Sequence, residues 1–454
     1  MDYLNRYHTL ARDLISSSGL SGKLPRNAIG SVIVRVAAVV LAFFVNVVLA
    51  RSLGISEYGL FIYASGWLNI LLIPACLGFD QLSVRQIAIY LSNTEWGKLK
   101  GIYQFAMSNT LRASIIIGLL MFGTIYIALG SQNIALVFYF TALLIPIGAI
   151  IRLQQGVLRG LHLISLGQIP EFIVQPFLLL LLLLVIFYGV KQVLTASEVM
   201  ALNIIAAITA LLTGSQLLTR AIPLESNKTD PVFDRKNWVS SLIPFMLIGG
   251  IFILNEQIAT VLLGLLSSTR QVAVFTAAEK WAGITIFMLQ ALNLGLAPIF
   301  ASLYAIGDRE QLQKIVTLSS QIITLFAFIP LLAFLIVPQL FLSAFGNDFS
   351  GGQIPLIILG IGQFINAFTG SVGFLLSMTG HERTLVGCSL LGIAVNLLLG
   401  ILLIPSMEVI GAAIATATSI IITNVALSIF VIRRLKIFPT ALGPMIAKYS
   451  FNLV

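Results

Sequence analysis

The chain has 454 residues, of which 58% are hydrophobic and only 9% are charged, and its formal net charge is +9. A soluble protein of this size needs a charged surface, so the mean hydropathy of +1.02 excludes a soluble domain and indicates an integral membrane protein. The alternating ten-residue pattern of membrane strands is absent from the sequence, which leaves helices as the spanning elements.

Apolar runs long enough to cross about 30 Å of hydrocarbon predict twelve helices. A polar segment, 1–27, precedes the first run, which is too long for a signal peptide and is expected to be retained. The predicted spans are 28–50, 58–79, 105–129, 134–156, 170–188, 199–219, 239–266, 272–303, 316–337, 354–378, 384–404 and 409–432.

The distribution of Lys and Arg predicts that both termini are cytoplasmic, because cations accumulate in short cytoplasmic loops. In that orientation twenty of the 26 cations, Arg152 among them, fall on the inside, whereas the outside receives only Arg51, Lys191 and Arg270. Orientation therefore explains the positive charge, and a nucleic-acid partner is not expected.

A hydrophilic segment, 221–238, divides the chain into two predicted six-helix bundles, 28–220 and 239–432, which are followed by a cytoplasmic tail, 433–454. An even number of spans in each half makes any repeat parallel, with its axis along the membrane normal.

Two pairs of segments indicate such a repeat. Ser56–Ala64 aligns with Arg270–Ala278 at an offset of 214, which places Gly59 opposite Ala273. Arg159–Gly167 aligns with Thr379–Gly387 at an offset of 220 and matches Gly160 with Gly380. We therefore predict an all-α fold of two pseudo-symmetric bundles with a site between them.

Charges inside spans are the first candidates for a transport site, because they are costly in hydrocarbon unless they face a cavity or a partner. Arg35 shares a polar stripe of the first span with Asn46, and it could line a cavity or extend to the inner headgroups. Arg112 is expected to extend to the headgroups. Arg51, at the outer end of the first span, is an interface anchor or an exit-side phosphate contact.

Glu256 and Lys280 are predicted at matching depth on consecutive antiparallel helices, beside Glu279. They could form a structural ion pair. Alternatively, Lys280 could attract a substrate phosphate while Glu256 holds the cation in place or takes a proton. Thr276 has helical spacing with Lys280, Gly283 and Phe287, which predicts one shared face.

No catalytic or metal-binding motif is present. The Walker spacing is missing, and the two cysteines, Cys76 and Cys388, lie in apolar runs. We therefore expect neither an enzyme nor a cofactor, and a proton or sodium gradient or the membrane potential as the driving force.

Several segments resemble the polysaccharide-type flippases of the multidrug/oligosaccharidyl-lipid/polysaccharide (MOP) exporter superfamily. They are Leu49–Gly66, Gly156–Glu171, Met378–Arg383 with the sequence MTGHER, Asn396, Leu403–Pro405, Gly411–Thr416 and Arg433-Arg434.

The resemblance implies a V-shaped pair of bundles with a central cavity that flips a lipid-linked oligosaccharide across the bacterial inner membrane. The hypothesis is therefore a flippase for an undecaprenyl-diphosphate-linked oligosaccharide, used in surface polysaccharide or O-antigen assembly. It would work as a monomer by alternating access, with membrane lipids and polysaccharide assembly enzymes as further partners.

Two alternatives stay open. A cation-coupled multidrug antiporter of the same superfamily needs buried carboxylates, but the candidate charges named above are three cations, Arg35, Arg112 and Lys280, and two carboxylates, Glu256 and Glu279. A membrane-embedded glycan polymerase would usually need a large outer loop, and the predicted outer loops are short.

Overall fold

A computed structural model describes residues 24–129, 133–190 and 194–443, and the side chains of 24–33, of Arg35 and of some others lie outside that description. Throughout the described residues the regular elements are helices. Ten of these helices are long and apolar enough to cross a membrane. Two of the ten are kinked, α2 (Leu24–Cys76) at Gly54 and α17 (Glu382–Phe430) at Glu408. Dividing each at its kink makes the arrangement consistent with twelve spans.

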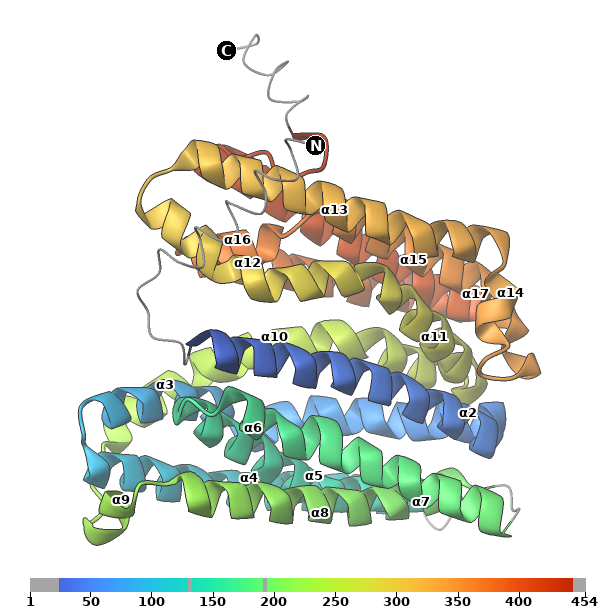
Figure 1. The fold of residues 1–454 in the computed structure, drawn as a ribbon. Coiled ribbons are helices and arrows are strands. Elements are labelled where there is room, and N and C mark those ends of the chain that lie inside the picture. Colours follow the sequence, from blue (N-terminus) through green and yellow to red (C-terminus); the bar gives the residue numbers. More distant parts are fainter. Residues whose placement is uncertain (1–23, 130–132, 191–193, 444–454) are drawn as a thin grey trace.

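The helices form two groups, which Figure 1 shows as two layers with α10 beside α2 between them. The N-terminal group contains α2, α3 (Phe79–Ser92), α4 (Trp96–Leu129), α5 (Asn133–Gly160), α6 (Ile164–Ile169), α7 (Gln175–Val190), α8 (Ala196–Ala221) and α9 (Leu224–Lys228). The C-terminal group contains α10 (Arg235–Leu266), α11 (Thr269–Ala282), α12 (Phe287–Ala305), α13 (Arg309–Ile336), α14 (Pro338–Leu342), α15 (Gln353–Thr369), α16 (Val372–Met378) and α17.

Three predicted spans contain a break. A π-helical turn, η1 (Pro170–Val174), joins α6 to α7, and a 3₁₀ turn, η2 (Gly283–Ile286), joins α11 to α12. Gly370, with φ of 71°, separates α15 from α16. Proline removes a backbone donor and glycine tolerates positive φ, so the sequence supplies a reason for the first and third breaks. These turns rotate the side chains that follow them relative to a continuous helix.

At the end of the molecule that carries the Gly54 kink, predicted to be the outer end, the two groups pack together. The Arg51 Nε donates a hydrogen bond of 2.7 Å to the carbonyl of Ala344. The Phe345 ring lies 6.0 Å from that of Phe43 and 6.4 Å from that of Tyr58. One buried apolar cluster continues from α2 through α11 to α15. The groups are therefore closed against each other at this end.

At the opposite, predicted inner end, the described residues form two separate cores. One contains Phe79, Leu99 and Leu153 of the N-terminal group. The other contains Phe300 and Leu427 of the C-terminal group. Since one core joins the groups at one end and two cores divide them at the other, this conformation is closed at the predicted outer end and separated at the predicted inner end.

Helix α10 contacts both groups. Trp238 at its start is fully buried in the N-terminal core, and its Nε1 donates a hydrogen bond of 3.0 Å to the hydroxyl of Tyr90. Near its other end, Leu262 lies against Gly400 of α17. The predicted C-terminal bundle therefore begins with a helix whose inner end packs in the N-terminal group.

The predicted repeat is visible in two places. Gly59 packs against Ala273, its predicted counterpart, since a Cβ on Gly59 would lie 3.3 Å from the Cβ of Ala273. This contact is what residues near a pseudo-twofold axis should make.

The second pair of segments forms two similar turns, but the predicted match of their glycines is wrong. The amide of Leu163 donates to the carbonyl of Leu158, and that of His381 donates to the carbonyl of Leu376, each at 2.9 Å. The residues with positive φ are His162 and Gly380, so the structural offset is 218 rather than 220. Both turns are tight connections between consecutive helices.

Candidate functional site

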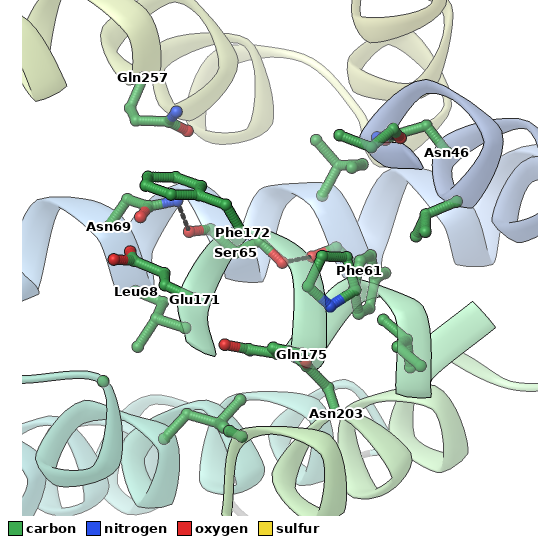
Figure 2. A pocket seen from close by; sticks show the side chains of 18 of the residues that line it. Asn46, Phe61, Ser65, Leu68, Asn69, Glu171, Phe172, Gln175, Asn203 and Gln257 are labelled. Carbon is green, nitrogen blue, oxygen red and sulfur yellow. Dashed lines mark hydrogen bonds between the residues drawn. The ribbon is translucent and has the colours of Figure 1, made fainter. Parts of the chain in front are cut away.

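A cavity of about 410 Å³ lies between the two groups. Side chains of α2, α5, η1, α7 and α8 form its N-terminal side, and side chains of α10 and α11 form the other. Figure 2 shows polar side chains from both sides facing this space, with Gln257 of α10 opposite Asn69 and Gln175. A cavity shared by two bundles is the location that the sequence predicted for the site.

Five predicted site residues line the cavity: Asn46, Glu256, Thr276, Glu279 and Lys280. The amide of Asn46 is held in place, because the Tyr58 hydroxyl donates to its Oδ1 at 2.9 Å and its Nδ2 donates to the carbonyl of Ala42 at 2.7 Å. The hydroxyl of Thr276 is buried without a hydrogen-bond partner in the described protein.

The direct ion pair between Glu256 and Lys280 is not formed. Both side chains are exposed and line the cavity, and neither is within ion-pair distance of an opposite charge among the described residues. Equal depth does not make two helical side chains meet, because their rotation about each helix axis also matters. Glu256 and Lys280 are therefore two separate charges available to a bound molecule.

The predicted four-residue face of the eighth span is also interrupted. Thr276 and Lys280 lie in α11, but Gly283 begins η2 and Phe287 begins α12. The 3₁₀ turn changes the helical register, so Gly283 and Phe287 do not line the cavity with the other two.

Three predicted residues lie elsewhere or cannot be placed. Arg51 bonds the carbonyls of Ala344 and, at 3.4 Å, Ser343, so it anchors the closed outer end. Arg112 is exposed on α4 and does not line the cavity. The side chain of Arg35 lies outside the described residues, although its backbone belongs to α2.

Sequence reasoning missed a polar network on the N-terminal wall. The guanidinium of Arg152 donates a hydrogen bond of 2.8 Å to Asn69 Oδ1 and lies 3.6 Å from the Glu171 carboxylate. Gln175 Nε2 donates to Asn203 Oδ1 at 3.0 Å. Counting Arg152 among the cytoplasmic cations was wrong, because it lies within α5, as the predicted span 134–156 already implied, and its side chain is only 17% exposed.

The signal for this network was present in the stretch from Pro170 to Pro176. Glu171 directly follows a proline at the start of an apolar run, inside the predicted span 170–188, but it was not singled out among the charges within spans. In the structure the amide of Gln175 bonds the carbonyl of Pro170, which widens the turn into η1. Such π turns occur frequently at functional sites, so a carboxylate between two prolines was a usable sign.

The charge balance of the described lining differs from the predicted one. Three carboxylates, Glu171, Glu256 and Glu279, and two cations, Arg152 and Lys280, face the cavity. The two groups of helices and the charged cavity between them define the class: a polytopic helical protein with the fold of a membrane transporter.

A family described as "Polysaccharide biosynthesis protein" matches residues 24–304, more than half of the chain, and the chain belongs to this family. The probable low-salt glycan biosynthesis flippase Agl15 of Haloferax volcanii is 24% identical over 181 residues. That match covers 39% of this chain and 38% of the length of the relative.

Solved structures of MOP superfamily transporters share the fold. A multidrug resistance MATE family transporter in an inward-facing conformation has a TM-score of 0.69 at 13% identity, covering 89% of this chain and 98% of that one. Lipid II flippase MurJ in an inward closed conformation has a TM-score of 0.68 at 14% identity, covering 90% and 87%. The two-bundle architecture predicted from the sequence is thus confirmed.

Proposed function

We propose that this protein is a flippase that moves a lipid-linked oligosaccharide from the cytoplasmic to the outer leaflet of the bacterial inner membrane. The observation that carries the proposal is the charged cavity between two groups of helices that are joined at the outer end and separated at the inner end. In the orientation predicted from the cations, such a cavity receives its substrate from the cytoplasmic side.

The chemistry of the cavity supports an undecaprenyl-diphosphate carrier. Lys280 is a cation without an ion-pair partner among the described residues, and a diphosphate is a strong acceptor for an ammonium group. Opening the outer end would require the contacts of Arg51 and Phe345 to break, which is the rearrangement that alternating access needs.

Further parts of the proposal concern the driving force and the partners. A proton or sodium gradient or the membrane potential drives the cycle, and both termini face the cytoplasm. The protein works as a monomer beside the enzymes of polysaccharide assembly, for a surface polysaccharide such as O-antigen. The family membership and the relative from Haloferax volcanii support this setting.

The test is to delete the gene and locate the lipid-linked oligosaccharide. It should accumulate in the cytoplasmic leaflet, and the wild-type gene should restore its export. Lys280→Ala should fail to restore export at normal protein level, whereas the matched control Arg112→Ala, which removes a cation outside the cavity, should succeed. Normal surface glycan together with altered drug sensitivity would refute the flippase.

A cation-coupled multidrug antiporter is the second candidate, because the described lining holds more carboxylates than cations. A positively charged drug would pair with Glu256 and Glu279. Drug efflux that needs these carboxylates, in cells whose surface glycan does not depend on the gene, would favour this function over the first.

A further inference from the structure

One wall of the cavity carries an aromatic ring that binding of a diphosphate does not require. Phe172 lies in η1, and 43% of it is exposed although it lines the central cavity. Figure 2 shows it pointing into the cavity, with Asn69 and Gln175 on the same wall and Gln257 across from them. An exposed ring inside a cavity leaves apolar surface uncovered until a ligand packs on it.

The amides around this ring keep hydrogen-bonding capacity. Each amide has two N–H groups and an oxygen that accepts twice. Asn69 accepts from Arg152 and donates to the carbonyl of Ser65 at 3.1 Å, which leaves one donor and one acceptor position. Gln175 uses only its Nε2, and Gln257 forms no hydrogen bond among the described residues. Donors and acceptors therefore surround the ring in mixed order.

A pyranose ring matches this arrangement. Its C–H faces are apolar and pack on aromatic rings, while its hydroxyls both donate and accept, as amides do. A drug-like cation would need a carboxylate beside the aromatic ring, but the adjacent Glu171 is already paired with Arg152.

The charges of the lining select against acidic sugars. Arg152 is already ion-paired with Glu171 and hydrogen-bonded to Asn69. Lys280 is therefore the cation available to the diphosphate in the described lining. A carboxylate on the glycan would meet Glu256 and Glu279 with no further described cation to neutralise it. Like charges that lie close together within one cavity repel each other.

We infer that Phe172, Asn69, Gln175 and Gln257, together called the glycan wall, bind uncharged sugar residues, with Phe172 as the stacking surface. The inference rests on the proposed function and adds to it the class of glycan: neutral rather than uronic. In this arrangement the sugar lies against the glycan wall while the diphosphate lies toward Lys280 on α11.

Three soluble probes test the inference on the full chain in lipid nanodiscs: farnesyl diphosphate, farnesyl-diphosphate-glucose and farnesyl-diphosphate-glucuronic acid. The two sugars differ only at C6, so their difference reports charge. The glucose probe should bind about tenfold more tightly than farnesyl diphosphate, which corresponds to 1.4 kcal/mol. The glucuronic acid probe should bind at least about fivefold more weakly than the glucose probe.

Variants of Phe172 test whether its ring causes the tighter binding of the glucose probe. Phe172→Ala should abolish the gain from glucose and leave the affinity for farnesyl diphosphate unchanged, which also shows that the variant is folded. Phe172→Trp should keep the gain. Phe177→Ala, which removes the same ring from an exposed position of α7 outside the cavity, is the matched control and should behave as wild type.

The outcomes distinguish a failure of this inference from a failure of the proposed flippase function. A glucose gain that survives in Phe172→Ala, or equal affinity for the two sugar probes, overturns the glycan wall while the flippase stands. Failure of the wild type to bind farnesyl diphosphate at all refutes the proposed function and the inference with it.

Discussion

Replacing Gly59 by alanine should open the outer end of the molecule. Gly59 lies on α2 beyond the kink, against the first turn of α11. A Cβ at this position would overlap the carbonyl oxygen of Thr269 and touch the Cβ of Ala273. A backbone carbonyl cannot rotate away as a side chain can, so the two groups of helices must separate to accept the methyl group.

The expected magnitude follows from the cost of an extra methyl in a packed interface, which is about 1–3 kcal/mol. This cost applies only while the outer end is closed, so it changes the ratio of closed to open molecules by about 5- to 150-fold. Gly123→Ala on α4 is the control, because a Cβ there meets nothing within 4 Å. It corrects for the better helix propensity of alanine.

Electron–electron double resonance between spin labels can measure the opening. Cys76 and Cys388 are first replaced, and cysteines are introduced at Ser56 and Ser350, which are exposed at the outer ends of the two groups. Gly59→Ala should add a longer distance that Gly123→Ala lacks. A distribution identical to that of Gly123→Ala would show that the packing of Gly59 does not govern closure.

Three other predictions follow from the contacts. Arg51→Ala removes hydrogen bonds from a charged donor and should weaken outer closure by about 2 kcal/mol, seen with the same labels; an unchanged distance would contradict this. Lys280→Ala should stop transport, and adding Glu256→Gln should not restore it, because the two residues are not ion-paired; restored export would show that they pair during the cycle. Arg152→Met or Glu171→Met alone should lower the free energy of unfolding in detergent by about 3 kcal/mol, because each leaves a largely buried charge unpaired. The double variant should recover most of this loss in free energy. Equal losses in single and double variants would argue against the pair.

The sequence predicted the cavity residues that stand out in apolar runs. Asn46, Glu256 and Lys280 are polar positions in otherwise hydrophobic spans, and they line the cavity. The sequence could not predict that Arg152 lines the cavity, because counting cations near helix ends does not measure the depth of a side chain. Gln175 and Asn203 lie 28 residues apart, and only helix packing brings them together.

The errors in the C-terminal half have a similar cause. Glu256 and Lys280 were predicted at equal depth, which did not determine whether their side chains meet, and η2 changed the register that related Lys280 to Phe287. Periodicity describes a continuous helix, whereas transporter helices are interrupted where the substrate lies.

The place of α10 has a consequence for the ancestry of the fold. The repeat divides the chain into two similar halves, yet Trp238 at the start of the second half is buried among helices of the first. A helix of one half that packs into the core of the other half is the arrangement that domain swapping produces. Two chains separated between residues 221 and 238 should therefore assemble with each other, because Trp238 of the second half is buried in the core of the first.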